Sequence, residues 1–159
     1  MWTLMDSPVG ELRIVEQDGA IAAIEFTPYR DPDGRVRGAR DDTHPLLAET
    51  VRQLRAYFGR ELKEFDLPLA PVGSDFQRRV WDQLCGIGYG ETASYGQIAH
   101  RLGMTNAASR AVGLANGRNP IPIVIPSHRV IGANGTLTGY AGGLERKQLL
   151  LELEQDALF

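Results

Sequence analysis

A connector rich in proline and glycine, residues 62–74, divides this chain into two parts of different character. Short runs of β-branched and aromatic residues dominate before the connector, and helical patterns dominate after it. We therefore predict an α/β (α+β) fold with two domains, residues 1–72 and residues 73–159. The length of 159 residues suits one compact unit or two small ones.

The first part has three β-type runs separated by turn residues. Turns at 7–10 and 17–19 predict an antiparallel meander. The strands are expected at Trp2–Asp6, Glu11–Glu16 and Ala20–Phe26. Residues 27–42, rich in Pro, Gly, Asp and Arg, predict a mobile loop. A helix with Thr43 as its N-cap should follow and end at Gly59.

The second part has an N-cap residue before each of three helical patterns. Ser74, Ser94 and Asn106 are of the residue types that accept hydrogen bonds from the first turn of a helix. The helices are predicted at 75–85, 95–102, 107–116 and, without a clear cap, 144–154. The second and third of these form a helix-turn-helix candidate. The apolar run Ile121–Ile125 predicts a short buried strand.

Composition restricts the classes of partner. The formal net charge of −3 gives no overall attraction to DNA, so a nucleic-acid surface must be a local basic patch. Basic residues do concentrate in the second part, at Arg101, Arg110, Arg118 and Arg129. No basic segment followed by a long apolar run opens the chain, and no apolar run is long enough for a membrane span. We expect a cytoplasmic protein with no membrane partner.

Cysteine and histidine usage gives no sign of a disulfide framework or a metal site. The single cysteine, Cys85, excludes an internal disulfide, and the three histidines are scattered along the chain. We expect no metal and no cofactor. Cys85 follows an amphipathic pattern and is interpreted as a small, buried packing residue.

Five motifs follow one another in the second part and are specific when taken together. They are Phe76-Gln77-Arg78-Arg79-Val80-Trp81, Tyr89-Gly90-Glu91-Thr92 with Ser94-Tyr95-Gly96-Gln97, Ser109-Arg110-Ala111-Val112-Gly113, Pro126-Ser127-His128-Arg129, and Gly139-Tyr140-Ala141-Gly142-Gly143. In this order they resemble the O6-alkylguanine-DNA alkyltransferases, and the resemblance covers nearly the whole chain. It implies an RNase H-like N-terminal domain and a helical domain with a DNA-binding helix-turn-helix. It also implies direct-reversal repair, in which one protein molecule moves one alkyl group from guanine O6 to its own cysteine.

The resemblance assigns roles at the reaction centre. Ser127 stands where the family has its acceptor cysteine, and His128 corresponds to the base, which acts through a water. Glu154 would orient the imidazole, as the third member of a nucleophile–base–orienter set does. Asn119 would hold the active-site turn by side-chain hydrogen bonds. Tyr140 would donate its hydroxyl to the guanine ring as the base leaves.

The resemblance also assigns residues to DNA, because an alkylated base inside a duplex must be rotated out before it can react. Arg110 would enter the base stack, and Tyr95 would press on the phosphate. Ala108 and Gly113 are small where a helix would approach the minor groove. The remaining predicted DNA contacts are Ser94 and Arg129. Singly, most of these residues have ordinary structural explanations, and only the motif context favours function.

The serine at position 127 predicts that recognition and chemistry are separated in this chain. Its hydroxyl is far less acidic than a thiol, so we expect lesion binding without alkyl transfer. The expected partner is double-stranded DNA containing O6-alkylguanine, bound by a protein that is monomeric in solution and can cluster on DNA. Three alternatives stay open: an engineered inactive alkyltransferase, a natural alkyltransferase-like lesion sensor, and a helix-turn-helix transcription regulator. The regulator would bind one DNA sequence far better than others.

Overall fold

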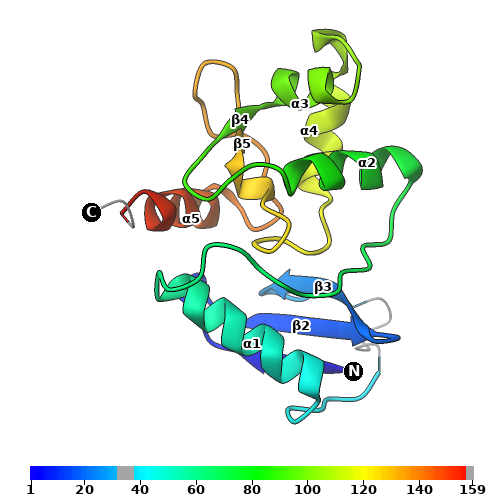
Figure 1. Ribbon diagram of the computed structural model, residues 1–159, viewed down its shortest axis with the longest axis vertical. Coiled ribbons are helices and arrows are strands. Elements are labelled where there is room, and N and C mark those ends of the chain that lie inside the picture. Colours follow the sequence, from blue (N-terminus) through cyan, green and yellow to red (C-terminus); the bar gives the residue numbers. More distant parts are fainter. Residues whose placement is uncertain (32–37, 157–159) are drawn as a thin grey trace. The chain divides into compact units, whose positions relative to one another are not determined.

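The computed structural model describes residues 1–31 and 38–156 and divides into two compact units, Met1–Pro71 and Val72–Phe159. The first unit is built on a small sheet and the second is mainly helical, so the predicted α/β class is confirmed (Figure 1). Residues 32–37 of the predicted mobile loop lie outside the described residues. Across the two described ranges, no helix is both long and apolar enough to cross a membrane.

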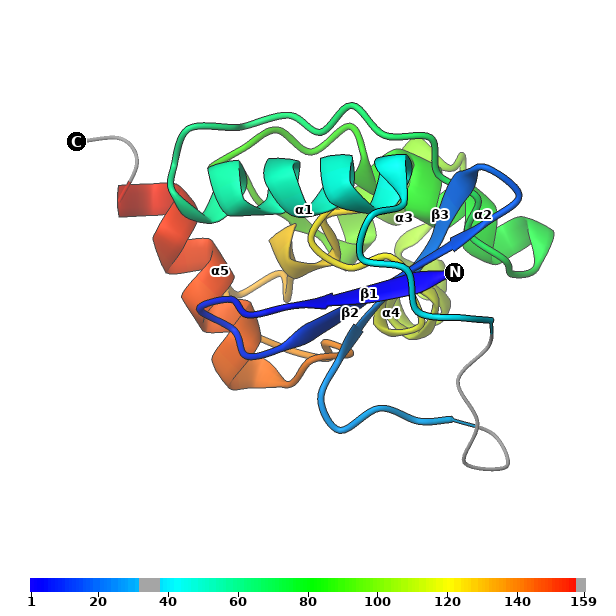
Figure 2. The same cartoon turned by 90° about the horizontal axis from the view of Figure 1, so that it is seen from below.

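The first unit is a three-stranded antiparallel sheet with one helix packed on it. The strands β1 (Trp2–Met5), β2 (Leu12–Gln17) and β3 (Ala20–Phe26) pair in sequence order, which confirms the predicted meander. Helix α1 (Pro45–Phe58) packs against the sheet (Figure 2). The fully buried side chains between sheet and helix are Leu12, Ile14, Ile21, Leu47, Leu54 and Tyr57.

The start of α1 differs from the sequence prediction, because the N-cap is His44 and not Thr43. The Nδ1 atom of His44 accepts a hydrogen bond from the Leu46 amide at 3.2 Å. Pro45 is the first helical residue, a position that suits the fixed φ of proline, so the cap falls on the residue before it. The Thr43 hydroxyl instead donates to Asp41 at 2.9 Å.

The second unit is a set of short helices with one small parallel strand pair. Its elements are α2 (Asp75–Leu84), β4 (Ala93–Ser94), α3 (Tyr95–Arg101), the 3₁₀ turn η2 (Asn106–Ala108), α4 (Ser109–Gly117), the 3₁₀ turn η3 (Ser127–Arg129), β5 (Val130–Ile131) and α5 (Leu144–Asp156). Strands β4 and β5 pair in parallel. Helices α2, α3 and α4 contact one another, and α5 contacts η3.

The predicted caps of α2 and α3 are confirmed. Ser74 and Ser94 each accept a hydrogen bond from the amide three residues later, at 3.1 Å in both cases. Gln77 and Gln97 return a bond to the cap amide, which completes a capping box at each helix. These local signals explain why both helices begin where the sequence predicts.

The sequence predicted Asn106 as the N-cap of the helix 107–116, and this prediction is wrong. Asn106 begins η2, and α4 starts after Ala108 without a side-chain cap. The Asn106 side chain turns toward α3 instead: a Cβ atom at Gly96 would lie 2.9 Å from Asn106 Oδ1. Gly96 therefore allows the close approach of α3 and η2.

The predicted strand at Ile121–Ile125 is wrong, although its burial is confirmed. Ile121, Ile123 and Ile125 are each at most 2% exposed. The segment is a tight turn in which the Ile125 amide donates to the Ile121 carbonyl at 2.9 Å. Ile123 has φ = 74°, a region that β-branched residues rarely adopt. Burial of three isoleucines holds this unfavourable backbone in place directly before Ser127.

Candidate active site and DNA-binding surface

Two side-chain amides hold the turn that carries Ser127. Asn119 Nδ2 donates to the Ile125 carbonyl at 2.7 Å and to Ser127 Oγ at 3.0 Å, while its Oδ1 accepts from the Ile121 amide at 3.0 Å. Asn116 Nδ2 donates to the Ser127 carbonyl at 3.2 Å. Ser127 is only 1% exposed. The Ser127 hydroxyl is therefore held in a buried position by the side chain of Asn119, and the Ser127 carbonyl by that of Asn116.

The sequence analysis gave Asn116 no role, and the structure shows that it holds the Ser127 carbonyl. It is fully buried on the inner face of α4, one residue after Ala115 and one turn after Val112. Its spacing from Val112 places Asn116 on the apolar face of the helix. A polar residue on such a face could have indicated its role from the sequence.

A buried ion cluster lies beside this turn. Glu154 Oε2 is 2.7 Å from His128 Nε2, and Arg129 Nε donates to Glu154 Oε1 at 2.8 Å. Arg129 Nη2 donates to Oε2 at 3.0 Å, and the Gly90 amide donates to Oε1 at 3.3 Å. All three charged or titratable side chains are at most 7% exposed. Helix α5 thus supplies the carboxylate that fixes both His128 and Arg129.

The pKa values of this cluster follow from burial and pairing. Burial alone would raise the pKa of Glu154, but hydrogen bonds from His128 and Arg129 outweigh it and lower this pKa to about 2. Burial lowers the pKa of His128, against the opposing effect of Glu154. The cluster at neutral pH is therefore an ionised carboxylate, a neutral imidazole and a guanidinium. Since Nε2 faces the carboxylate, it carries the proton, and Nδ1 carries the lone pair.

Tyr140 and Lys147 are both buried, and Lys147 lies on α5, the helix that also carries Glu154. Burial raises the pKa of the Tyr140 hydroxyl, which stays protonated. Lys147 is fully buried, and its Nζ donates to the carbonyls of Val130 and Thr138 at 2.5 and 2.6 Å. Burial lowers the pKa of Lys147 to about 8. The sequence analysis gave Lys147 no role, yet it fastens the loop before Tyr140 to α5.

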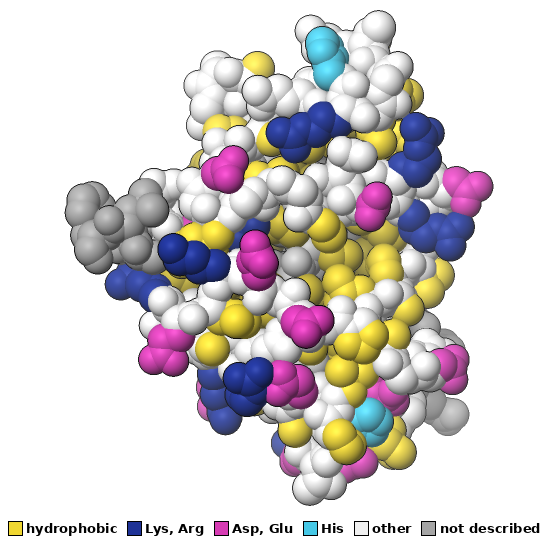
Figure 3. All heavy atoms as spheres, viewed as in Figure 1, with side chains coloured by type: hydrophobic (Ala, Val, Ile, Leu, Met, Phe, Trp, Pro, Cys, Tyr) yellow, Lys and Arg dark blue, Asp and Glu magenta, His cyan; other side chains and the backbone are white. Residues whose placement is uncertain are grey.

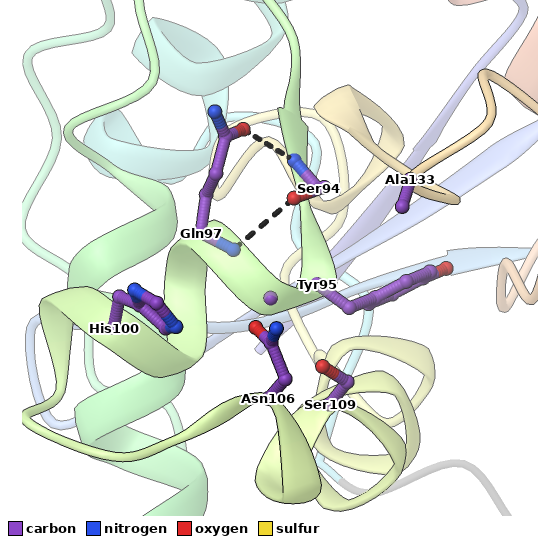
Figure 4. A pocket seen from close by; sticks show the side chains of 8 residues that line it. Ser94, Tyr95, Gln97, His100, Asn106, Ser109 and Ala133 are labelled. Carbon is purple, nitrogen blue, oxygen red and sulfur yellow. Dashed lines mark hydrogen bonds between the residues drawn. The ribbon is translucent and has the colours of Figure 1, made fainter.

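The predicted DNA contacts Ser94 and Tyr95 line an open depression of about 490 Å³ at the start of α3 (Figure 4). Its other lining residues are Gly96, Gln97, His100, Asn106, Ser109 and Ala133. The Tyr95 hydroxyl donates to the Thr138 carbonyl at 3.2 Å and accepts from the Thr138 hydroxyl at 2.8 Å. The aromatic ring is thus held at the edge of this depression.

Helix α4 presents a mixed basic and apolar face to solvent. The exposed residues at and just before the helix share one side, with Val112, Ala115 and Asn116 buried on the other. They are Ala107, Arg110, Ala111, Leu114 and Arg118. Figure 3 shows further Lys and Arg side chains over the region that holds α2 and α3. The second unit therefore has a local basic surface on a chain with negative net charge.

Comparison with known proteins identifies the family. Residues 75–156 match the family described as 6-O-methylguanine DNA methyltransferase, DNA binding domain, and residues 1–71 match its ribonuclease-like domain. A methylated-DNA–protein-cysteine methyltransferase of Mycolicibacterium paratuberculosis is 51% identical over 95% of this chain and 90% of its own length. The chain belongs to the methylated-DNA–protein-cysteine methyltransferase family. The enzyme of that name from Methanosarcina acetivorans is 46% identical over 96% of this chain and 97% of its own length.

Solved structures of this methyltransferase family have the same fold. The O6-methylguanine methyltransferase of Mycobacterium tuberculosis superposes with a TM-score of 0.89 at 46% identity, covering 98% of this chain and 93% of its own. The structure of that organism's protein in complex with DNA superposes with a TM-score of 0.84 at 45% identity, with the same coverage. This family is thus one of DNA alkyltransferases that bind DNA.

Two residues of this methyltransferase-family protein differ in burial from the sequence predictions. Arg129 was predicted to contact DNA, but it is 6% exposed and is bound to Glu154 and, at 2.6 Å, to the Ile87 carbonyl. Its charge is needed beside a buried carboxylate, so we revise it to a structural partner of Glu154. Cys85 was predicted to be buried, but it is exposed, because it caps the end of α2 after the last buried residue, Leu84.

Proposed function

We propose that this methyltransferase-family protein binds O6-alkylguanine in double-stranded DNA but does not take over the alkyl group. Helices α3 and α4 act as a helix-turn-helix at the minor groove, and the damaged base rotates out toward Ser127. One observation carries the proposal. Ser127 has an amide on its Oγ, a neutral histidine next in sequence and a carboxylate behind that histidine, and only the thiol is lacking.

His128 has the properties of a base that serves residue 127. Its Nε2 donates to Glu154, which leaves Nδ1 as the nitrogen that can accept a proton. In the described part of the chain, Nδ1 is buried and has no hydrogen-bond partner. The lowered pKa keeps the ring neutral at pH 7, as a base requires. We place a relaying water between Nδ1 and the side chain of residue 127.

Alkyl transfer needs a nucleophile that serine does not supply. A bond forms from residue 127 to the alkyl carbon, the bond from that carbon to guanine O6 breaks, and the proton of residue 127 passes to His128. A thiol near its ordinary pKa of about 8.5 yields thiolate to a neighbouring base. The electron pair of the broken bond stays on the leaving guanine, towards which Tyr140 would donate its hydroxyl. A buried serine hydroxyl does not ionise appreciably, and displacement at saturated carbon has no tetrahedral oxyanion intermediate of the kind that serine hydrolases stabilise.

The surface of α4 supports a minor-groove contact. A Cβ atom at Gly113 would meet only the Tyr95 ring, at 3.6 Å, which is ordinary van der Waals distance. Packing within the protein therefore does not require glycine there, whereas a closely approaching DNA backbone would. Ala108 is similarly small, and Arg110 is exposed on the same helix, free to enter the base stack. Tyr95 and Ser94 lie at the adjoining depression, where a phosphate would pass.

Restoring the thiol tests the proposal. The variant Ser127→Cys in a Cys85→Ser background has one cysteine, so any methyl group found on it has an unambiguous location. We expect it to gain the mass of one methyl group per protein from duplex DNA containing O6-methylguanine. The Cys85→Ser protein with Ser127 should gain none, yet should bind that duplex more tightly than its guanine counterpart.

Each failure of this experiment has a different meaning. A methyl group on Ser127 itself would refute the loss of transfer. A Ser127→Cys protein that binds the lesion without accepting methyl would favour a natural lesion sensor, whose machinery has diverged beyond the acceptor. Strong preference for one undamaged sequence, with no preference for the lesion, would favour a transcription regulator.

A further inference from the structure

Thr138 bonds the hydroxyl of Tyr95 through two of its own groups. The Thr138 hydroxyl donates to Tyr95 Oη at 2.8 Å, and Tyr95 Oη donates to the Thr138 carbonyl at 3.2 Å. The first distance is ordinary for a hydrogen bond between hydroxyl groups, and the second is long. Thr138 is exposed and Tyr95 is half-buried, so the pair lies at the surface and outside the apolar core. The sequence analysis gave Thr138 no role.

The Thr138 carbonyl has a second donor that lies closer than Tyr95. Lys147 Nζ donates to this carbonyl at 2.6 Å and to the Val130 carbonyl at 2.5 Å. Lys147 is fully buried on α5, and Val130 belongs to β5, which pairs with the strand directly before Tyr95. The position of Thr138 is therefore set without Tyr95. Its carbonyl also stays hydrogen-bonded if the Tyr95 proton turns to another acceptor.

The Tyr95 hydroxyl can serve two partners at once, because a phenol has one proton to donate and lone pairs with which to accept. It can keep the bond from the Thr138 hydroxyl while its proton leaves the long bond to the carbonyl. The ring borders the depression at the start of α3 and lies beside Gly113 of α4, where a Cβ atom would be 3.6 Å from it (Figure 4). Phosphate oxygens of DNA accept hydrogen bonds from tyrosine hydroxyls.

We infer that Thr138 is a positioning residue for DNA binding: its hydroxyl holds Tyr95 Oη as an acceptor, so that the Tyr95 proton can be donated to a DNA phosphate oxygen. The inference rests on the proposed function, because it needs Tyr95 to lie against DNA. No covalent bond changes, and the Tyr95 proton only turns from the Thr138 carbonyl to the phosphate. A hydroxyl that accepts a hydrogen bond is a stronger donor, so Thr138 both orients and strengthens the contact.

The test removes the Thr138 hydroxyl with and without its partner. Dissociation constants are measured by fluorescence anisotropy for a duplex with O6-methylguanine and for its guanine counterpart. Thr138→Val should weaken binding of both duplexes by roughly 2–10-fold, the range for one hydrogen bond. In a Tyr95→Phe background, which has no hydroxyl to hold, Thr138→Val should have no further effect. Thr138→Ser keeps the hydroxyl and should bind within about twofold of the unmodified protein.

Thr136→Val is the matched control. Thr136 is an exposed threonine of the same loop, and its hydroxyl donates to Asn134 Oδ1 at 2.7 Å and not to Tyr95. The same substitution there should leave DNA binding unchanged. Because both threonines are exposed, both valine variants should fold, and urea unfolding checks this. If Thr138→Val does not fold, Thr138→Ala takes its place.

Each outcome decides between the inference and the proposed function. Weaker binding by Thr138→Val that is absent in the Tyr95→Phe background, with rescue by Thr138→Ser, supports the inference. Unchanged binding by Thr138→Val overturns it, as does a loss that persists without the Tyr95 hydroxyl or that Thr138→Ser shares. If the unmodified protein binds the lesion duplex no better than the guanine duplex, the proposed function fails. The coupling of Thr138 to Tyr95 on the guanine duplex then still decides the inference.

Discussion

Replacing Glu154 by glutamine should strongly destabilise the second unit. The substitution keeps the shape of the side chain but removes the charge that pairs with Arg129 and His128, at 2.8 and 2.7 Å. Arg129, only 6% exposed, would then be a buried charge without a counter-charge. Breaking one side of a buried ion pair costs about 3–5 kcal/mol.

The pKa of Glu154 gives an independent magnitude. A carboxyl whose pKa falls from 4.5 to about 2 on folding contributes about 3 kcal/mol, since each pKa unit corresponds to about 1.4 kcal/mol. Because the folded pKa is the lower one, this contribution is complete above pH 4.5 and is lost as the pH falls from 4.5 toward 2. Glu154→Gln should therefore cost much less stability near pH 3 than at pH 7.

The assay uses tryptophan fluorescence during urea unfolding. The chain has two tryptophans, so a Trp2→Phe background leaves Trp81, buried in the second unit and bonded to the Ala115 carbonyl at 2.8 Å, as the reporter. The companion variant Arg129→Met, and the double variant, complete a mutant cycle in which the two costs should not add. A loss below about 1 kcal/mol for Glu154→Gln at pH 7, or additive costs, would show that the ion cluster does not hold the unit together.

Three further predictions concern the surface of the second unit. Ser74→Ala and Ser94→Ala each remove a capping box, and each should lower the free energy of unfolding in urea by about 1 kcal/mol. Only Ser94→Ala should also weaken DNA binding. Equal DNA binding by the two variants would show that Ser94 is not part of the DNA surface. Arg118→Ala should reduce the slope of log affinity against log salt by about 1, as for one lost phosphate contact, whereas Arg110→Ala should abolish the preference for the lesion with little change in slope. If Arg110→Ala reduced the salt slope and Arg118→Ala abolished the lesion preference, Arg118 and not Arg110 would be the residue that enters the base stack. Cys85 should react with a disulfide reagent in the folded protein without urea, and protection until unfolding would contradict its exposed position.

Local chemistry in the sequence was a reliable guide where a few neighbouring residues decide the structure. Ser74 and Ser94 cap the predicted helices because each has a glutamine three residues later, and a capping box needs nothing from the rest of the chain. The meander of the first unit follows similarly from its turns and alternating residues. The first residue of α1 was misjudged only because Pro45 outweighs Thr43.

Predictions failed where distant residues decide the outcome. The run at Ile121–Ile125 has the composition of a buried strand, yet Asn119 accepts the hydrogen bond of its first amide, and within the described residues its bridge joins Pro122 to Ile125 of the same segment. Arg129 was assigned to DNA as one of the basic residues concentrated in the second part, and nothing nearby in the sequence indicates that it pairs with a carboxylate 25 residues later on α5. The contact of Asn116 with the Ser127 carbonyl is visible only in three dimensions.

The backbone at Ile123 has a consequence for how this family can change over time. A β-branched residue at φ = 74° is stable only where its surroundings over-determine it, and here the surroundings are three buried isoleucines and the bonds of Asn119. Only one of the bonds of Asn119, from its Nδ2 to Ser127 Oγ at 3.0 Å, involves the side chain at position 127. Under the proposed function, the acceptor side chain can therefore change while the turn that carries it and the surface of α4 keep their structure.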